Sequence, residues 1–310
     1  MQQDDDVLVM GEDVGKNGGV FRATEGLYEE FGEDRVIDTP LAEAGIVGTA
    51  IGMAAYGLKP VPEIQFMGFI YPAFDQIVSH AARLRTRSRG RFTCPMVIRA
   101  PYGGGIRAPE HHSESTEAFF AHQPGLKVVI PSTPYDTKGL LTSAIRDPDP
   151  VMFLEPKLIY RAFRGDVPTD SYEVPIGEAA VRKEGSDISV FTWGAMTRPT
   201  VEAAEQLEGE IDVEVVDLRT VSPLDEETIV ESFKKTGRAA VVHEAPKTGG
   251  LVDDRGAIAS IIQEEALLYQ EAPVERITGF DTPFPLYALE DYYLPEPARI
   301  KEGIRDAVDF

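Results

Sequence analysis

The sequence predicts an α/β protein with two three-layer domains, each built on a mostly parallel sheet. Short apolar runs alternate with segments of helical period along the 310 residues, a pattern typical of parallel sheets with helices on both faces. A chain of this length exceeds one ordinary core and fits two domains of about 150 residues each. Between residues 161 and 187 the alternation gives way to Gly, Pro, Asp and charged residues. We therefore expect domains over residues 1–165 and 187–310, joined by a linker over 166–186.

The spacing of apolar residues predicts the strands and helices of the N-terminal half. Five apolar runs predict buried strands over residues 7–10, 36–37, 96–98, 127–130 and 151–154. Three segments with helical spacing predict the covering helices, over residues 44–56, 73–85 and 137–146.

The C-terminal half repeats the alternation. Its apolar runs predict strands over residues 188–191, 213–216, 239–242 and 274–277. Helices are expected between them, over residues 201–207, 226–235 and 258–269. Pro199 and Pro223 stand near the starts of two of these helices, where proline is tolerated best.

The chain carries a large surplus of acidic residues. Its 52 Asp and Glu side chains outnumber 30 Lys and Arg, which gives a net charge of −22. This charge repels nucleic acid and anionic membranes, so we expect neither as a partner. Arginines outnumber lysines by 20 to 10, and such a composition resembles that of halophilic proteins, in which salt screens the self-repulsion. We interpret the charge mainly as an adaptation to the solvent.

Targeting and redox signals are absent from the sequence. No window holds the 18 apolar residues of a membrane helix, and residues 1–6 are acidic and polar, unlike a secretory or transit peptide. The single cysteine, Cys94, predicts neither an internal disulfide nor a metal cluster. We expect a soluble, cytoplasmic protein.

The densest chemical signal lies in residues 38–54. Gly45, Gly48 and Gly52 recur at helical spacing and line one face of the predicted helix, where another backbone or a flat ligand could approach closely. Each glycine costs roughly 1 kcal/mol relative to alanine, so three on one face indicate a compensating role. Glu43 would ordinarily be a first-turn residue favoured by the helix dipole. Beside this face it becomes a candidate for a buried functional carboxylate.

Aromatic residues gather in residues 63–78, just before a predicted helix. Rings in this position could stack on a planar ligand. For Phe66 and Phe74, core packing is the better explanation. For Phe69, the residues alone leave core packing and ligand contact both open.

The third segment joins three glycines, residues 103–105, to the histidines His111 and His112. The pattern indicates a mobile loop that delivers an imidazole to a cleft. A metal site is a weaker alternative, because the segment lacks an i, i+4 histidine pair and a thiolate. Two surface histidines without a role remain the other alternative.

Five arginines alternate over residues 83–91. Alone they would suggest phosphate or nucleic acid, but against the acidic background we favour a subunit contact or a carboxylate network. The sequence contains neither Gly-x-x-x-x-Gly-Lys-Ser/Thr nor Gly-x-Gly-x-x-Gly after a strand, so no phosphate loop is predicted.

Taken in order, these segments resemble the beta subunit of the decarboxylating component of pyruvate and branched-chain 2-oxo acid dehydrogenase complexes, in the transketolase-like thiamine diphosphate superfamily. Further matching motifs are Gly11-Glu-Asp-Val-Gly15, Pro124-Gly-Leu-Lys-Val-Val-Ile-Pro131, Ser143-Ala-Ile-Arg-Asp147, Glu155-Pro-Lys157 and Val242-His-Glu-Ala245. The resemblance spans nearly the whole chain. It implies a pyrimidine-type domain followed by a transketolase-type C-terminal domain, and an oxidoreductase that decarboxylates a 2-oxo acid and reductively acylates a lipoyl group.

The resemblance also implies roles for individual residues. Glu43 matches the carboxylate that contacts the aminopyrimidine ring of thiamine diphosphate. Phe69 matches the aromatic residue near that ring, and Gln65 lies close by. His112 matches the histidine near the substrate and the incoming lipoyl group. The sequence departs from the family pattern at Gly68, where many relatives carry Asp, and at residue 114, where Glu replaces Gln.

Metals and partners follow from the same resemblance. Main-chain carbonyls of Ala144, Asp147 and Asp149 match a potassium site of some members. The diphosphate and its magnesium are held by an alpha subunit through a Gly-Asp-Gly motif, and none occurs in this sequence. We therefore expect an α2β2 heterotetramer, active only when the alpha subunit is present. The other expected partner is the acyltransferase core that carries lipoyl domains.

Three alternatives keep the same fold. Transketolase and deoxyxylulose-phosphate synthase chains include their own diphosphate domain and are far longer. An acetoin dehydrogenase beta subunit would differ only in substrate. A non-catalytic assembly subunit would lack the equivalents of Glu43 or His112, and both residues are present. The sequence does not identify the 2-oxo acid, because a methylene group changes binding by only about 1–3 kcal/mol.

Overall fold

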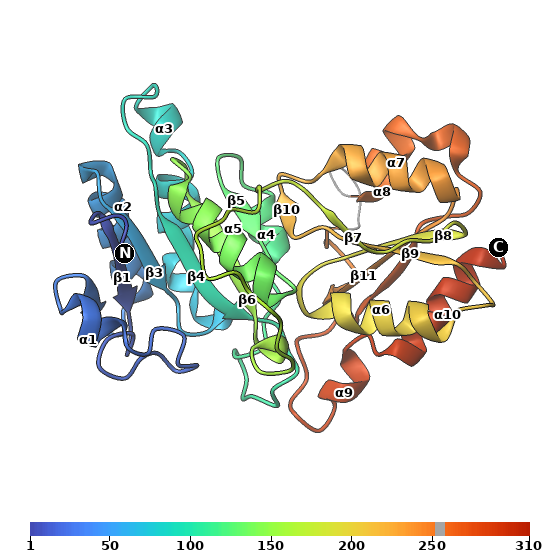
Figure 1. Ribbon diagram of the computed structural model, residues 1–310, viewed down its shortest axis with the longest axis horizontal. Coiled ribbons are helices and arrows are strands. Elements are labelled where there is room, and N and C mark those ends of the chain that lie inside the picture. Colours follow the sequence, from blue (N-terminus) through green and yellow to red (C-terminus); the bar gives the residue numbers. More distant parts are fainter. Residues whose placement is uncertain (252–257) are drawn as a thin grey trace.

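The computed structural model describes residues 1–251 and 258–310. Over these residues the chain forms two α/β units side by side, each around a central sheet (Figure 1). The first sheet has seven strands in the order β10-β5-β6-β4-β3-β1-β2, and the second has five in the order β12-β11-β8-β9-β7. In this part of the chain only the β10–β5 and β7–β9 pairs are antiparallel. The predicted class, α/β with two mostly parallel sheets, is therefore confirmed.

Six strands of the first sheet come from the N-terminal half: β1 (Val7–Gly11), β2 (Val36–Asp38), β3 (Lys59–Glu63), β4 (Val97–Tyr102), β5 (Lys127–Val129) and β6 (Val151–Pro156). The seventh, β10 (Thr220–Ser222), belongs to the C-terminal half and pairs with β5. The two halves therefore share a sheet, which fixes one against the other.

β3 is a strand that the apolar pattern did not predict, because it contains Pro60 and Pro62. Proline lacks an N–H donor and argues against a central strand. The N–H of Lys59 faces β1, donating to Asp6, and the N–H of Ile64 faces β4, donating to Arg99. By alternation both proline nitrogens face β4, which pairs with β3 only at its end. The two residues without an N–H donor therefore face a part of β4 with which β3 forms no hydrogen bonds.

The helices of the first unit are α1 (Leu27–Phe31), α2 (Glu43–Tyr56), α3 (Leu84–Arg87), α4 (Glu117–Ala121) and α5 (Pro134–Arg146). The single helix predicted over residues 73–85 is wrong in detail. Short 3-10 turns at Met67–Phe69 and Tyr71–Ala73 lead into a π-helical stretch, Gln76–Ala81, before α3. A π-helix accommodates extra residues per turn, which an apolar period of 3.6 cannot reveal.

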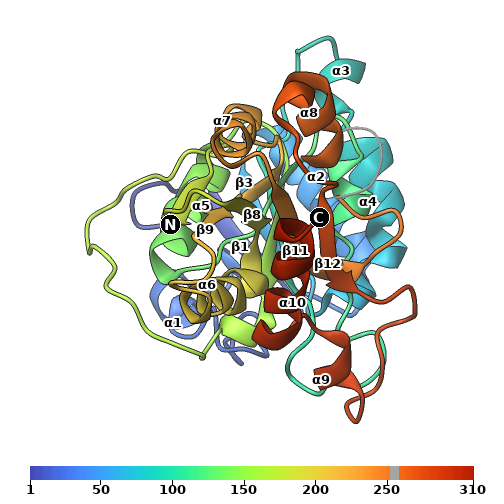
Figure 2. The ribbon, with the colours of Figure 1, turned by 90° about the vertical axis from the view of Figure 1, so that its right-hand side faces the viewer.

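The second sheet consists of β7 (Ala180–Lys183), β8 (Ile188–Thr192), β9 (Val213–Asp217), β11 (Ala239–Pro246) and β12 (Glu275–Gly279). Its helices are α6 (Thr197–Gln206), α7 (Glu226–Thr236), α8 (Ile258–Glu265), α9 (Glu290–Tyr293) and α10 (Pro297–Val308). Figure 2 shows α7 and α8 on one face of this sheet and α6 with α10 on the other. Strand β7 lies within the stretch predicted as linker, and α10 was not predicted.

One apolar cluster runs through both units. It joins Ile98 of β4 and Ile130, which follows β5, to Phe191, Trp193 and Phe233 of the second unit. Among the described residues, no helix is both long and apolar enough to cross a membrane.

Candidate active site

The carboxyl ends of four parallel strands meet at one edge of the first sheet. The register pairs Gly11, at the end of β1, with Asp38 at the end of β2 and with Glu63 at the end of β3. Glu63 in turn pairs with Arg99 in β4. In open parallel sheets, ligands bind beyond this edge.

Each residue of the predicted site follows one of these strands. Glu43 opens α2 after β2, Gln65 and Phe69 follow β3, and His112 lies on the loop after β4. The strand order β4-β3-β1-β2 therefore brings all four residues to the same edge.

Glu43 is buried, with 8% of its surface exposed, and Glu12 lies close to it. Glu12 follows β1 directly, at the same edge. Burial raises the pKa of Glu12, and the neighbouring negative charge of Glu43 adds to the increase. The edge thus holds a pair of carboxylates. Glu12 was missed by the sequence reasoning, although it stands in the matching motif of residues 11–15.

The glycine face of α2 is uncovered in the single chain. Gly45 and Gly52 are exposed, and a Cβ atom added at Gly52 would meet no atom within 4 Å. Only Gln76 approaches Gly48. The face predicted to admit a flat ligand or another backbone is therefore open beside Glu43.

His112 packs between two phenylalanines. Its ring centroid lies 4.3 Å from that of Phe66 and 5.0 Å from that of Phe69, and the Phe69 contact is edge-on. Phe66 is buried, as predicted, but it also contacts the imidazole, which the sequence did not indicate. The Nδ1 atom of His112 lies 2.8 Å from the carbonyl oxygen of Glu110. A neutral imidazole that donates from Nδ1 has an unprotonated Nε2, ready to accept a proton.

Gly68, one of the departures from the family pattern, lies against the backbone of His111. A Cβ atom at residue 68 would lie 1.9 Å from the carbonyl oxygen of His111. His111 itself has a positive φ of 66°, a conformation that is costly outside glycine. The small residue at position 68 thus lets the histidine loop sit directly on the aromatic segment.

The three glycines of residues 103–105 are required by close packing. A Cβ atom would lie 2.3 Å from the carboxylate of Glu244 at Gly103, 2.3 Å from Phe284 at Gly104, and 2.4 Å from Leu158 at Gly105. In the sequence these glycines indicate mobility, but the contacts give them a different reason. At Gly103 and Gly104 the backbone approaches Glu244 and Phe284 of the C-terminal unit closely, and at Gly105 it approaches Leu158.

The residues matched to a potassium site lie around the end of α5. The carbonyl oxygen of Ala144 accepts from the N–H of Asp147 at 3.3 Å. The carboxylate of Asp147 pairs with Lys127, and that of Asp149 pairs with Arg85 at 2.6 Å. Because these side chains are occupied, only main-chain oxygens could serve a cation here. Among described residues, no group of three or more His, Cys, Asp or Glu is arranged for a metal.

The five arginines of residues 83–91 lie in α3 and in the residues directly before and after it, a segment that projects from the body (Figure 1). Arg85 joins the carboxylate of Asp149, in agreement with the predicted carboxylate network for this one arginine. Arg83, Arg89 and Arg91 are exposed, so a subunit contact stays a prediction.

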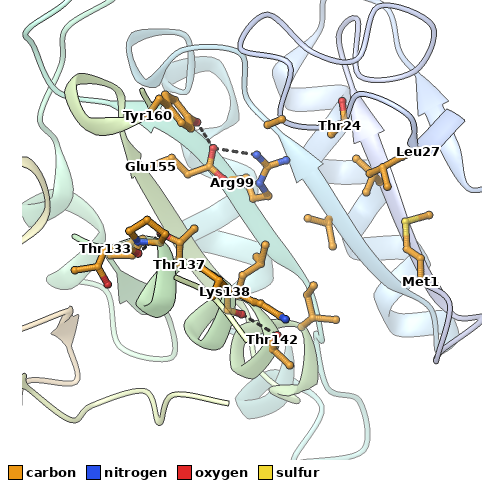
Figure 3. Close-up of a pocket in the computed structure, with 18 of the residues that line it drawn as sticks. Met1, Thr24, Leu27, Arg99, Thr133, Thr137, Lys138, Thr142, Glu155 and Tyr160 are labelled. Carbon is orange, nitrogen blue, oxygen red and sulfur yellow. Dashed lines mark hydrogen bonds and ion pairs between the residues drawn. The ribbon is translucent and has the colours of Figure 1, made fainter. Parts of the chain in front are cut away.

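A cavity of about 810 Å³ lies between α1 and α5 (Figure 3), on the face of the first sheet opposite to α2. Apolar side chains such as Val7, Val9 and Leu141 line it, and Arg99 with Glu155 stands at one end. None of the predicted site residues lines this cavity. The predicted site residues therefore lie apart from this cavity, at the strand edge. An active site completed by a second chain is an open surface in either chain alone.

Comparison with known protein families defines the class of protein. Residues 1–162 match the transketolase pyrimidine binding domain, and residues 177–300 match the transketolase C-terminal domain. A solved split-gene transketolase, described as an inactive beta4 tetramer, superposes with a TM-score of 0.75 over 99% of this chain and 94% of that chain. Their identity is 24%, so this likeness shows the fold alone. The chain thus has the two domains and the fold of a transketolase-type protein.

More similar relatives narrow the family. The chain is 55% identical to the pyruvate dehydrogenase E1 component subunit beta of Acholeplasma laidlawii, over 98% of this chain and 93% of the relative. It is 53% identical to the subunit of the same name from Bacillus subtilis, and 50% identical to the 2-oxoisovalerate dehydrogenase subunit beta of that organism. Both of these matches cover 100% of this chain and 95% of the relative. The chain belongs to the family of 2-oxo acid dehydrogenase beta subunits, and the resemblance inferred from the sequence is confirmed.

Proposed function

We propose that this chain is the beta half of a thiamine-diphosphate-dependent 2-oxo acid dehydrogenase, which decarboxylates a 2-oxo acid and transfers the acyl group to a lipoyl disulfide. The observation that carries the proposal is the gathering of Glu43, Phe69 and His112 at one open strand edge. The identity of the relatives supports the reaction class.

The residues at this edge suit the aminopyrimidine ring of thiamine diphosphate. Glu43 is a buried carboxylate, Phe69 offers an aromatic surface, Gln65 lies on the same segment, and the glycine face of α2 leaves room for a flat ring. When bound, the cofactor supplies the electron sink for decarboxylation. Glu43 would contact a nitrogen of this ring and exchange a proton with it, as a general acid–base residue does.

His112 is proposed to handle protons and charge near the substrate and the lipoyl group. Its Nδ1 atom is engaged by the carbonyl of Glu110, and its ring is fixed by Phe66 and Phe69. This leaves Nε2 to accept or donate a proton.

The cofactor's charged end requires a second polypeptide. The sequence contains no Gly-Asp-Gly motif, so we assign the diphosphate and its magnesium to an alpha subunit in an α2β2 heterotetramer. The acyltransferase core is then expected to dock on the C-terminal unit. The isolated chain should bind thiamine diphosphate negligibly in titration calorimetry. Tight binding by the chain alone would contradict the assignment of the diphosphate site to the alpha subunit.

Two finer assignments follow the family resemblance. A potassium ion would be held by the main-chain carbonyls of Ala144, Asp147 and Asp149. The net charge of −22 is assigned to a halophilic environment, because acidic residues outnumber basic ones by 52 to 30 and salt would screen the resulting repulsion.

The decisive experiment reconstitutes the chain with an alpha subunit and measures decarboxylation with an artificial electron acceptor. Glu43→Gln and His112→Ala should each lower kcat about 10²–10⁴-fold, as expected for lost acid–base catalysis. Glu29→Gln and His122→Ala change exposed residues of the same types and serve as matched controls. Wild-type rates in both site variants would refute the assignments.

A substrate panel separates the remaining alternatives. Turnover of pyruvate or branched 2-oxo acids supports the proposal, whereas turnover of acetoin alone identifies an acetoin dehydrogenase. No turnover of any substrate, with assembly intact, identifies a non-catalytic assembly subunit.

A further inference from the structure

The loop that carries His112 is closed at its base. The N–H of Gly103 donates to the carbonyl oxygen of Glu114 at 2.9 Å. We call residues 103–114 the histidine loop. It leaves the carboxyl end of β4 and reaches α9 of the C-terminal unit, beside which it lies in Figures 1 and 2.

Two carboxylates of the C-terminal unit bind the backbone of the histidine loop. Glu244, in β11, accepts from the N–H of Gly104 at 2.7 Å. Glu290, the first residue of α9, accepts from the N–H groups of Gly105 and Arg107. Only 4% of Glu244 and 1% of Glu290 is exposed. Burial raises the pKa of Glu244, and the hydrogen bond from the Gly104 N–H opposes this increase, because an N–H donor binds the ionised carboxylate most strongly.

The other limb of the histidine loop rests on the N-terminal unit. The backbone of His111 lies against Gly68, and the ring of His112 packs on Phe66 and Phe69. The loop thus bridges the two units: its glycine limb is bound to one, and its imidazole limb packs on the other.

A buried lysine lies beneath this bridge. Lys157 directly follows β6, is 3% exposed, and its Nζ atom lies 6.0 Å from the ring centroid of Phe66. Burial lowers the pKa of Lys157 to about 8, although the negative charges of Glu244, Glu290 and Glu114 act to raise it. Among described residues, the Nζ atom has no hydrogen-bond partner. It therefore acts on the carboxylates through its charge, as the positive member of a buried cluster.

We propose that Glu244 and Glu290 are positioning residues for His112: they hold the glycine limb of the histidine loop, with Lys157 as their counter-charge, and so fix where the imidazole stands at the strand edge. This inference deepens the proposed function and depends on the role given there to His112. Neither carboxylate touches the reacting atoms. Each acts through the loop backbone, so the position of the C-terminal unit helps to determine the position of His112 at the active site.

Amide hydrogen exchange on the isolated chain tests whether the two carboxylates bind the backbone of the histidine loop. Glu290→Ala should accelerate exchange at Gly105 and Arg107 at least tenfold, and Glu290→Gln, which keeps an acceptor oxygen, should restore most of the protection. Asp291→Asn is the matched control, because it removes only an exposed pair with the Arg107 side chain. Unchanged exchange in Glu290→Ala would overturn the proposal.

Kinetics of the reconstituted enzyme test the consequence for His112. Glu290→Ala should lower kcat tenfold or more while the KM for the 2-oxo acid changes little, and Glu290→Gln should recover kcat. If Glu290→Ala folds poorly, Glu244→Ala provides the same comparison at Gly104, with Glu244→Gln as the variant that should recover kcat. Faster exchange with an unchanged kcat would overturn the positioning role. A wild-type enzyme without activity would refute the proposed function instead, while the exchange result would still decide whether the carboxylates hold the loop.

Discussion

The imidazole of His112 stands edge-on to the ring of Phe69, with centroids 5.0 Å apart and an interplanar angle of 80°. Phe69 follows β3 and His112 follows β4, so the contact joins the loops of two neighbouring strands. A histidine held in this way has a defined position, and catalysis is sensitive to displacements of about 1 Å. Substitutions that move either loop should therefore change the rate without touching the imidazole.

Gly68→Ala is such a substitution. A Cβ atom at residue 68 would lie 1.9 Å from the carbonyl oxygen of His111, so the histidine loop must shift. We expect kcat of the assembled enzyme to fall about 10²-fold. Steady-state kinetics check this, with Gly165→Ala as a control at an exposed glycine without a positive φ, whose added Cβ would meet Pro134 only at ordinary contact distances of 3.4 Å or more. Unchanged kcat in Gly68→Ala would show that the loop relaxes without displacing His112.

Gly52→Ala should have opposite effects on the stability of the isolated chain and on its assembly with the alpha subunit. Gly52 is exposed in α2 with no atom near its Cβ position, so alanine should stabilise the isolated chain by about 1 kcal/mol. If the glycine face receives another chain or the cofactor, the same methyl group should weaken assembly or cofactor binding. Chemical unfolding and sedimentation with the alpha subunit measure the two effects. Glu205→Ala, at an exposed position of α6, should leave assembly unchanged.

Glu117→Gln should change the pH dependence of stability. Burial raises the pKa of Glu117 from 4.5 to about 7, so the folded state favours the protonated carboxyl. Its stabilising contribution is complete below pH 4.5 and is lost as the pH rises through about 7. Glutamine stays neutral and can still accept the hydrogen bond from Trp193. The variant should therefore be more stable than wild type by about 1–3 kcal/mol at pH 8.

Urea unfolding at several pH values between about 5 and 8 measures this difference. The gap between Glu117→Gln and wild type should narrow steadily toward pH 5. A gap that does not depend on pH would show that Glu117 is not the titrating group, and Glu29→Gln, at an exposed position, should show no gap.

Arg99→Met should destabilise the first sheet. Arg99 is buried between Glu155, which it binds through Nε and Nη2 at 2.6 and 2.9 Å, and Glu63, at 2.9 Å. Removing the guanidinium leaves two buried carboxylates without their cation, at an expected cost of about 3–5 kcal/mol. Arg85→Met breaks an exposed pair with Asp149, which solvent screens, and should cost far less unfolding free energy. Equal losses of unfolding free energy in the two variants would contradict this ranking.

Salt should stabilise the chain. The surplus of 22 negative charges favours expansion, and ions screen this repulsion over a Debye length that falls from about 10 Å at 0.1 M to 3 Å at 1 M. The melting temperature should rise steeply with KCl over this range. Sucrose controls for non-ionic stabilisation. A melting temperature independent of KCl would remove the basis for the halophilic interpretation.

The apolar pattern predicted most of the sheet strands, because buried parallel strands are recognisable as short apolar runs. It missed β3, where Pro60 and Pro62 obscure the strand, and it placed β7 in a linker, because an edge strand carries a weaker pattern. These misses share a cause: whether a weak run becomes a strand depends on the neighbour that it meets in the fold.

The sequence by itself identified the motifs that carry Glu43, Phe69 and His112 and predicted one site for them. The tertiary structure was needed to reveal β3, the strand that Phe69 follows to the shared edge. Only the tertiary structure decided how the histidine is held. Glu244 lies 140 residues from Gly104, and Glu290 lies 185 residues from Gly105. Such hydrogen bonds depend on how the two sheets pack together, and no local period or spacing records that packing.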